Sequence, residues 1–419
     1  MSELESLRHR IRSQFPPLAC SDSICFLDNA AGTLVPASVI SSVTEVLTCR
    51  GVVNSLPGYK WGRQQEKIKS DAHDATGLFV NAPRGGKDIV LGPSATALAF
   101  RLSAALGKQF VRGDAIVVSG LEHECNASPW RHLQATLGLE LRVWRARWPS
   151  GELDVEDLKA LLEDGKVRLV ALTVASNCFG LCNDVALAAS VCHAQGALIC
   201  VDSVHGAPHF LPNVQRDDLD FLLFSPYKLC APHLGALYIR GSLLRDLDVP
   251  TLHFYDPSEA HKFEYGTPPY ESLAGWLSAL EYFACCLGGK GPSEPLTRAA
   301  LEAAWIRVAD LERPVKAALV QGLSSIPGVT VYGSLDLERR VGTVAFRVLG
   351  LSCKSVAEKL GERGVCVGNG HFYATMPNEA LGLLEDGGVV RASIAHYTSV
   401  NEVERFLSEV RSLAERQEC

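Results

Sequence analysis

Lys228 stands at the end of a short apolar run, and its surroundings are those of a reactive amine. The run, Phe221–Phe224, is rich in aromatic residues and is bounded by Asp220 and Pro226, a pattern typical of a buried strand. A lysine at the end of such a strand is poorly solvated, which favours the neutral amine over the ammonium. A neutral amine is a nucleophile that forms a Schiff base with an aldehyde. The ordinary alternative is a lysine in an exposed loop.

A carboxylate, Asp202, ends another apolar run, residues 197–202, and stands 26 positions before Lys228. In a pyridoxal phosphate site a lysine binds the aldehyde of the cofactor. A carboxylate pairs with the protonated pyridine nitrogen, which makes the ring an electron sink. These two strand ends therefore predict pyridoxal 5'-phosphate as the cofactor.

The two segments resemble those of the class V aminotransferase superfamily, in its cysteine desulfurase-like branch. That branch has Asp-Gly-Ala-Gln and Ser-Gly-His-Lys where this chain has Asp202-Ser-Val-His205 and Ser225-Pro-Tyr-Lys228. The resemblance implies that all four named residues, together with Tyr227, contact the cofactor. His205 and Tyr227 depart from the family pattern, which leaves open a relative that binds cofactor or a partner without turnover.

The cofactor phosphate is expected at a turn that opens a helix. Gly92-Pro-Ser94-Ala-Thr96 follows an apolar run, and free N–H groups at a helix N-terminus bind phosphate. A plain N-cap explains Ser94 equally well. The family holds the phosphate at this turn, so we favour that role for Ala95 and Thr96.

Two further residues are assigned to the cofactor by resemblance. Glu122-His123-Glu-Cys-Asn126 is similar to Glu-His-His-x-Asn, in which the first histidine stacks on the pyridine ring, and this implies stacking by His123. The second family histidine is a glutamate here. Asn177 follows the run 167–174 and is implied to contact the cofactor's phenolic oxygen or the substrate carboxylate.

Substrate binding is implied at three places. Val389-Val-Arg391-Ala-Ser393 is similar to a family strand whose arginine clamps the substrate α-carboxylate, a task that suits the guanidinium fork. Asn29 and Ala30 lie in a segment similar to one at the family's active-site rim, although an ordinary tight turn is an equal alternative. His371 is the third expected contact.

The loop that carries His371 lacks the residue on which desulfurases depend. They have Arg-x-Gly-His-x-Cys, whose cysteine attacks the substrate sulfur, whereas Tyr373 stands at that position here. A phenol cannot carry a persulfide, and Cys366, inside an expected strand, is a poor substitute. We therefore expect Tyr373 to act as an acid or base.

A segment further along the chain implies a homodimer. Phe263-Glu-Tyr-Gly266-Thr267-Pro resembles the family's Phe-Glu-x-Gly-Thr-Pro, in which the Gly-Thr pair reaches the phosphate of the neighbouring subunit. The resemblance implies that Gly266 and Thr267 complete the partner's site across a twofold axis.

Strands alternate with helices up to a Gly/Pro-rich break at residues 288–292, which predicts a mostly parallel sheet with right-handed crossovers. The resemblance implies the fold-type I pyridoxal-phosphate-dependent transferase fold, with a seven-stranded type of sheet and a smaller C-terminal α+β domain. We expect an N-terminal arm over 1–20 that packs on the small domain, a large cofactor-binding domain over 21–288, and the small domain over 289–419. The candidate groups follow strands, where open α/β sheets bind ligands.

The composition is that of a globular protein: 419 residues, 47% hydrophobic and 21% charged. A net charge of -7 gives no reason to expect nucleic acid or membrane partners. The charged N-terminus is no signal peptide, and no apolar stretch has bilayer length. The 14 scattered cysteines are typical of reduced thiols in a cytoplasmic protein. Without Cys-x-x-Cys or a histidine pair to match Cys178 and Cys182, no metal site is expected.

Together these features predict an enzyme that acts on an α-amino acid through an external aldimine and a quinonoid carbanion, with Lys228 as proton shuttle. Pocket shape, not fold, selects the bond that breaks. We favour decarboxylation coupled to aldol or Mannich-type carbon–carbon bond formation, as in fungal members that lack the cysteine, because Tyr373 offers an acid or base. A C–S lyase, a desulfurase-like activity, an epimerase and a non-catalytic relative stay open.

Overall fold

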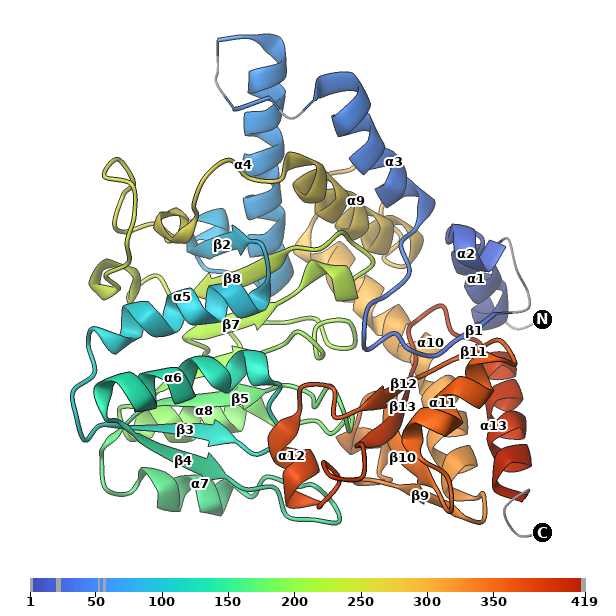
Figure 1. The fold of residues 1–419 in the computed structure, drawn as a ribbon. Coiled ribbons are helices and arrows are strands. Elements are labelled where there is room, and N and C mark those ends of the chain that lie inside the picture. The colour runs from blue at the N-terminus through green and yellow to red at the C-terminus, as the bar shows by residue number, and fades with distance from the viewer. Residues whose placement is uncertain (1–2, 20–23, 52, 56–57, 416–419) are drawn as a thin grey trace.

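The computed structural model describes residues 3–19, 24–51, 53–55 and 58–415, and it contains a large helix-covered sheet and a smaller sheet (Figure 1). The strands of the large sheet are, in spatial order, β2 (Ile89–Gly92), β8 (Gly235–Ile239), β7 (Phe221–Phe224), β6 (Leu198–Asp202), β5 (Val167–Thr173), β3 (Ala115–Ser119) and β4 (Glu140–Trp144). Of these seven, β8 runs antiparallel to both neighbours, and the other pairs are parallel. The predicted mostly parallel sheet is therefore confirmed.

Helices cover both faces of this sheet (Figure 1). The elements of one layer are α4 (Lys60–Val80), α7 (Val155–Leu162), α8 (Val185–Ala194) and α9 (Tyr270–Cys286), with α3 (Ala37–Glu45) packed against α9. The other layer contains α5 (Ala95–Gly107) and α6 (Ser128–Leu137). Along β7, Leu222 and Phe224 pack in the first layer's core and Phe221 and Leu223 in the second. A strand covered on both faces reads as a continuous apolar run, which is why its position could be predicted.

The carboxyl ends of the central strands meet at one edge of the sheet. Thr173 at the end of β5 pairs with Asp202 at the end of β6, and Asp202 pairs with Leu223 of β7. The loops that follow these strands therefore converge, and they carry the predicted chemistry.

The C-terminal part of the chain forms a second core. Its antiparallel sheet has the order β12 (Gly368–Gly370), β13 (Val389–Ser393), β10 (Thr343–Val348) and β9 (Val329–Val331). The helices of this part are α10 (Arg298–Ser324), α11 (Cys353–Gly361), α12 (Thr375–Ala380) and α13 (Val400–Glu415). This is the predicted α+β arrangement.

The N-terminal segment ties the two parts together. Arg8 of α1 (Glu3–Arg12), which precedes the short α2 (Pro16–Ala19), donates to the carbonyl oxygens of Leu311 and His396. The short β1 (Cys25–Phe26) pairs in parallel with β11 (Val365–Cys366). Residues just after the predicted arm thus join the smaller core, while the domain boundaries themselves stay predictions. Within the described ranges, no helix combines the length and apolar character that membrane crossing demands.

Candidate active site

A cavity of about 130 Å³ lies at the carboxyl edge of the large sheet. Its lining residues come from the loops after the strands and are Ser94, Ala95, Thr96, His123, Cys125, Thr173, Ala175, Asn177, Asp202, Val204, His205, Ser225, Tyr227 and Lys228. All the predicted cofactor contacts except Thr267 are in this set. The structure therefore brings together residues that are far apart in the sequence.

Lys228 reaches the cavity from a single 3-10 turn, Pro226–Lys228, that follows β7 directly. Its side chain is buried, and burial together with the positive charge of Arg391 lowers the pKa of the amine to about 8. At neutral pH about a tenth of the amine is therefore unprotonated, far more than for an ordinary lysine, and the neutral form is the nucleophile.

Asp202 is held in place by two hydrogen bonds. Its Oδ1 accepts from the backbone N–H of Val204 at 2.7 Å, and its Oδ2 accepts from the Cys125 thiol at 3.2 Å. Burial, and then the charge of Asp202, raise the pKa of Cys125 well above its ordinary value. Cys125 is therefore a protonated donor that orients the carboxylate. Sequence reasoning missed it, because a cysteine two residues after His123 carries no signal by type or spacing.

A second buried carboxyl group, Glu122, organises the loop after β3. Its oxygens accept from Ser119 Oγ and the Thr173 backbone N–H, both at 2.5 Å, and from Asn126 Nδ2 at 2.9 Å. Burial, and then the charge of Asp202, raise its pKa to about 8. These bonds fix the base of the loop that carries His123.

His123 presents a neutral ring to the cavity. Its Nδ1 accepts a hydrogen bond from the Cys125 backbone N–H at 2.9 Å, which places the proton of the neutral ring on Nε2. Burial is the main cause that lowers its pKa. The ring lies 5.5 Å from that of Tyr373, so the two aromatic groups stand on the same side of the site.

The start of α5 forms the candidate phosphate cradle. Ser94 caps the helix by accepting from the Ala97 N–H at 3.1 Å, and the first N–H groups of the helix, those of Ala95 and Thr96, have no acceptor within it. A Cβ atom at Gly235 of β8 would lie 2.2 Å from the Ser94 carbonyl carbon and 2.5 Å from the Ala95 nitrogen. Glycine at this position lets the turn pack closely on the sheet.

Arg391 lies on β13, and two of its five N–H groups are bonded to the protein. Its Nη1 donates to the Asn177 carbonyl at 3.0 Å and its Nη2 to Asp28 Oδ1 at 2.9 Å. The Phe372 ring covers the guanidinium at 3.9 Å. Nε is buried with no partner among the described residues, so its N–H remains available to a substrate carboxylate. Sequence reasoning missed Phe372.

The loop around Phe372 and Tyr373 adopts an unusual backbone. Both residues have positive φ angles, 53° and 56°, a region that favours glycine. Tertiary hydrogen bonds hold them there: Asn177 Nδ2 donates to the Phe372 carbonyl and the Glu124 N–H to the Tyr373 carbonyl, each at 2.8 Å. The Tyr373 side chain is 66% exposed at the mouth of the site. The Tyr373 N–H donates to Nδ1 of His371, which is also exposed.

The other predicted contacts lie in different settings. Asn29 and Ala30 border a separate void of about 20 Å³ on another side of Lys228. The Asn29 amide is already bonded, accepting from Tyr397 Oη at 2.5 Å and donating to the Ser393 carbonyl at 2.8 Å. Thr267 is exposed and does not line either cavity.

His205 and Tyr227, the two departures from the family pattern, both line the main cavity. His205 Nε2 lies 2.9 Å from Thr343 Oγ1, and burial lowers its pKa well below the ordinary value. The Tyr227 ring stacks on His233 with 5.0 Å between ring centroids. Both side chains therefore have protein partners beside the cavity.

The lining fits pyridoxal phosphate. It offers a desolvated amine, an anchored carboxylate, a flat neutral ring and a helix N-terminus for the phosphate. In addition, Asn177 Oδ1 is buried without a hydrogen-bond partner among the described residues, although Nδ2 of the same amide is bonded. A buried polar atom of this kind is costly unless a ligand pairs with it.

Comparison with known proteins agrees with this site. Residues 25–289 and 298–406 match the family described as aminotransferase class-V. The chain is 35% identical over 410 residues to the aminotransferase-like protein FGM3 of Gibberella zeae, covering 95% of this chain and 96% of that protein. It is 29% identical over 416 residues to a cysteine desulfurase of Escherichia coli O9:H4 (strain HS), with the same coverage.

Solved structures show the same arrangement over nearly whole chains. The apo cysteine desulfurase from Thermococcus onnurineus NA1 matches with a TM-score of 0.86 and 25% identity, covering 97% of this chain and 98% of that chain. The cysteine desulfurase CsdA from Escherichia coli, in its S-sulfonic acid form, matches with a TM-score of 0.82 at the same identity and coverage.

Proposed function

Because the chain belongs to the aminotransferase class-V family of pyridoxal-phosphate-dependent enzymes, we propose that it couples decarboxylation of an α-amino acid to formation of a carbon–carbon bond. Family, fold-type I fold and cofactor are those predicted from the sequence. The substrate class, the bond that breaks and the residue roles given below are the proposal.

When bound, pyridoxal phosphate supplies an aldehyde for the substrate amine and a ring that accepts the electron pair of a bond broken at Cα. We assign to Lys228 the amine that holds the aldehyde and that, once released by the substrate amine, is free to shuttle protons within the site. Asp202 would hold a proton on the ring nitrogen, and the neutral His123 ring would pack on the ring face. The Asp202 carboxylate is already oriented by the Cys125 thiol, as pairing with the ring nitrogen requires.

The remaining cofactor contacts are assigned from the positions of their residues around the cavity. The N–H groups of Ala95 and Thr96 would bind the phosphate at the start of α5. Ser225, Tyr227 and His205 border the same cavity and would enclose the cofactor. Asn177, which also borders it, would use its unpaired Oδ1.

The observation that carries the proposal is the state of the thiols near the site. Cys125 is the cysteine that lines the cavity, and it is a protonated donor to Asp202 rather than a thiolate. Cys366 lies in β11, and burial followed by the charge of Asp28 raises its pKa above the ordinary value. Desulfurase chemistry requires a thiolate as nucleophile. These environments favour thiols instead, and the sequence resemblance puts Tyr373 where the family has its catalytic cysteine.

Arg391 would hold the substrate carboxylate before it is lost. Each terminal nitrogen donates one of its two N–H groups to a protein oxygen, and Nε has no partner among the described residues. The carboxylate would be held by the N–H groups that remain. Asn29, Ala30 and His371 would shape the rest of the substrate's surroundings.

In the proposed reaction the bond between Cα and the carboxylate carbon breaks, carbon dioxide leaves, and the electron pair stays at Cα. That pair forms a bond to the carbonyl carbon of an aldehyde, or to the matching carbon of an imine, and the acceptor's oxygen or nitrogen takes up a proton. We assign this proton to Tyr373, whose exposed side chain lies beside His123.

The test uses the cofactor-loaded enzyme with a panel of carboxyl-labelled amino acids, each with and without aldehyde acceptors. We expect labelled carbon dioxide whose release depends on the acceptor, and a product with the summed mass of both substrates less carbon dioxide. Incubation with cysteine, followed by alkylation and mass spectrometry, tests for desulfurase activity. A persulfide on any thiol, formed at the rate of turnover, would show that the chain is a desulfurase and would refute the proposal.

We also propose a homodimer in which Gly266 and Thr267 reach the partner's phosphate site. The observation that supports it is that Thr267 is exposed and is not among the residues that line its own chain's cavity. Sedimentation of the wild type, with cofactor affinity measured for Thr267→Ala, tests this. A monomer with full affinity would refute it.

A further inference from the structure

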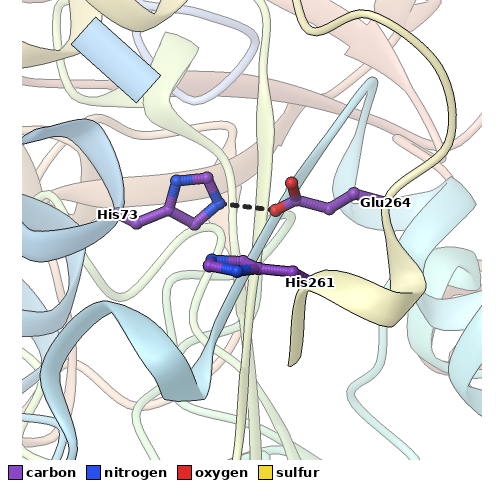
Figure 2. Close-up of side chains that lie close together, drawn as sticks. All are labelled: His73, His261 and Glu264. Carbon is purple, nitrogen blue, oxygen red and sulfur yellow. Dashed lines mark hydrogen bonds and ion pairs between the residues drawn. The ribbon is translucent and has the colours of Figure 1, made fainter. Parts of the chain in front are cut away.

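Three side chains of metal-binding type meet outside the catalytic cavity (Figure 2). They are His73 of α4, His261 of the 3-10 helix Ala260–Phe263, and Glu264, which follows that helix. One ligand atom from each lies within 4.8 Å of the other two. In the part of the chain that the structure describes, this is the one group of three or more histidine, cysteine, aspartate or glutamate residues with such proximity.

Two ligands of this cluster, His73 and Glu264, are oriented by neighbouring backbone groups. His73 Nδ1 lies 2.8 Å from the Lys69 carbonyl oxygen, which leaves Nε2 to face Glu264. Glu264 Oε1 also accepts from the Leu91 backbone N–H at 2.8 Å. Metal-binding histidines and carboxylates in proteins are typically fixed by such outer hydrogen bonds.

An ion pair accounts for the close approach of only two of the three residues. His73 Nε2 lies 2.6 Å from Glu264 Oε1, and the Glu264 carboxylate raises the pKa of His73 although burial opposes this. The ion pair does not account for the position of His261 in the cluster. Its Nε2 is buried without a hydrogen-bond partner among the described residues, and its ring lies edge-on to His73 with 4.4 Å between centroids.

The unpartnered nitrogen of His261 can offer its lone pair to a metal ion. The Glu259 carboxylate lies 3.7 Å from His261 Nδ1 and adds negative charge beside the cluster.

We propose that His73, His261 and Glu264 bind one zinc ion, which takes the place of the direct contact between His73 and Glu264. Two imidazoles and one carboxylate form a zinc donor set in proteins, with ligand distances of about 2.0–2.2 Å and a fourth position for water. Tetrahedral ligands at these distances stand about 3.4 Å apart, so the short His73–Glu264 contact opens as zinc binds.

Such an ion would link three elements near the phosphate cradle. His73 belongs to α4, Glu264 is bonded to Leu91 of β2, and β2 leads into the turn that contains Ser94. Zinc would therefore stabilise the segment before Gly266 against unfolding. This inference does not depend on which reaction the enzyme catalyses.

The experiment titrates zinc into chelator-treated, cofactor-loaded enzyme freed of unbound cofactor, with a chromophoric chelator as competitor. We expect one ion per chain. His261→Ala leaves the His73–Glu264 pair intact, so it should fold and retain the visible cofactor band. Removing a ligand should weaken zinc binding by at least about 100-fold, since losing an outer partner alone costs 10–100-fold.

The matched control is His193→Ala, because His193 also pairs with carboxylates, those of Asp218 and Asp220, at the surface. Its zinc affinity should equal that of the wild type. Cobalt substitution should give visible bands without the near-ultraviolet transitions of thiolate ligands. Absence of saturable zinc binding, equal affinity in His261→Ala, or thiolate bands from cobalt would each overturn the proposal.

Discussion

Replacing Lys228 with methionine should make the cofactor-free enzyme more stable, although it removes the residue to which we assign covalent chemistry. The structure buries the amine, and its pKa falls from the ordinary 10.5 to about 8. No hydrogen bond to its Nζ occurs among the described residues, and the negative charge of Asp202 only partly offsets burial and the charge of Arg391. The native state therefore holds the ammonium at a cost that methionine, with a chain of similar length, does not carry.

The magnitude follows from linkage. Below pH 8 the lysine is charged in both states and the full cost applies, about 3 kcal/mol at about 1.4 kcal/mol per tenfold change in proton affinity. Between pH 8 and 10.5 the unfolded chain binds more protons than the native one, so wild-type stability rises with pH. The advantage of Lys228→Met should accordingly fall to about 2 kcal/mol at pH 9 and below about 1 kcal/mol at pH 10.

Urea denaturation of both apoenzymes at pH 7, 9 and 10 measures this difference. Lys262→Met is the matched control, because its buried ammonium donates to the carbonyl oxygens of Leu244 and Leu247. Methionine removes both of these hydrogen bonds, so this variant should lose about 1–3 kcal/mol at neutral pH. If Lys228→Met were destabilised at pH 7, or if its advantage did not shrink with pH, the burial argument for a neutral amine would be wrong.

Three further outcomes are expected in steady-state assays. Asp202→Asn should lower turnover by about 10²–10⁴-fold, as expected for a positioned proton-handling group. Its stability in urea should stay near that of the wild type, and near-normal turnover would show that the role assigned to Asp202 is wrong. Tyr373→Phe should impair turnover without changing the cofactor's visible band, because the side chain lies at the mouth, whereas Cys366→Ser should alter neither. Arg391→Lys should raise the KM of the amino acid by about 10–100-fold, the equivalent of one charged hydrogen bond, and an unchanged KM would exclude Arg391 as its carboxylate site.

The positions of Lys228 and Asp202 could be predicted because local patterns determine them. Phe221–Phe224 is buried by helices on both faces, so its sequence is apolar throughout, and the polar residue after it must lie at the sheet edge. The resemblance then supplied residues such as His123, whose spacing alone carries little information.

The features that the sequence did not predict depend on contacts between segments that are far apart in the chain. Phe372 covers Arg391 from a left-handed backbone conformation that no glycine signals, because tertiary hydrogen bonds impose it. His73 and Glu264 are separated by 191 positions, so no spacing rule links them. The expectation that no metal site exists rested on cysteine patterns and did not consider such a cluster.

The pairing of the first segments with the last strand has a consequence for synthesis on the ribosome. Asp28 and Ala30 emerge early, but their partners Arg391 and Ser393 stand 363 positions later. Large domains generally fold as they emerge, from the N-terminal end onward. Here Leu27, which packs in the C-terminal core, must wait in contact with solvent or a chaperone until almost all of the chain has been translated. A nascent chain stalled before β13 could thus complete the large sheet and still lack its carboxylate-binding arginine.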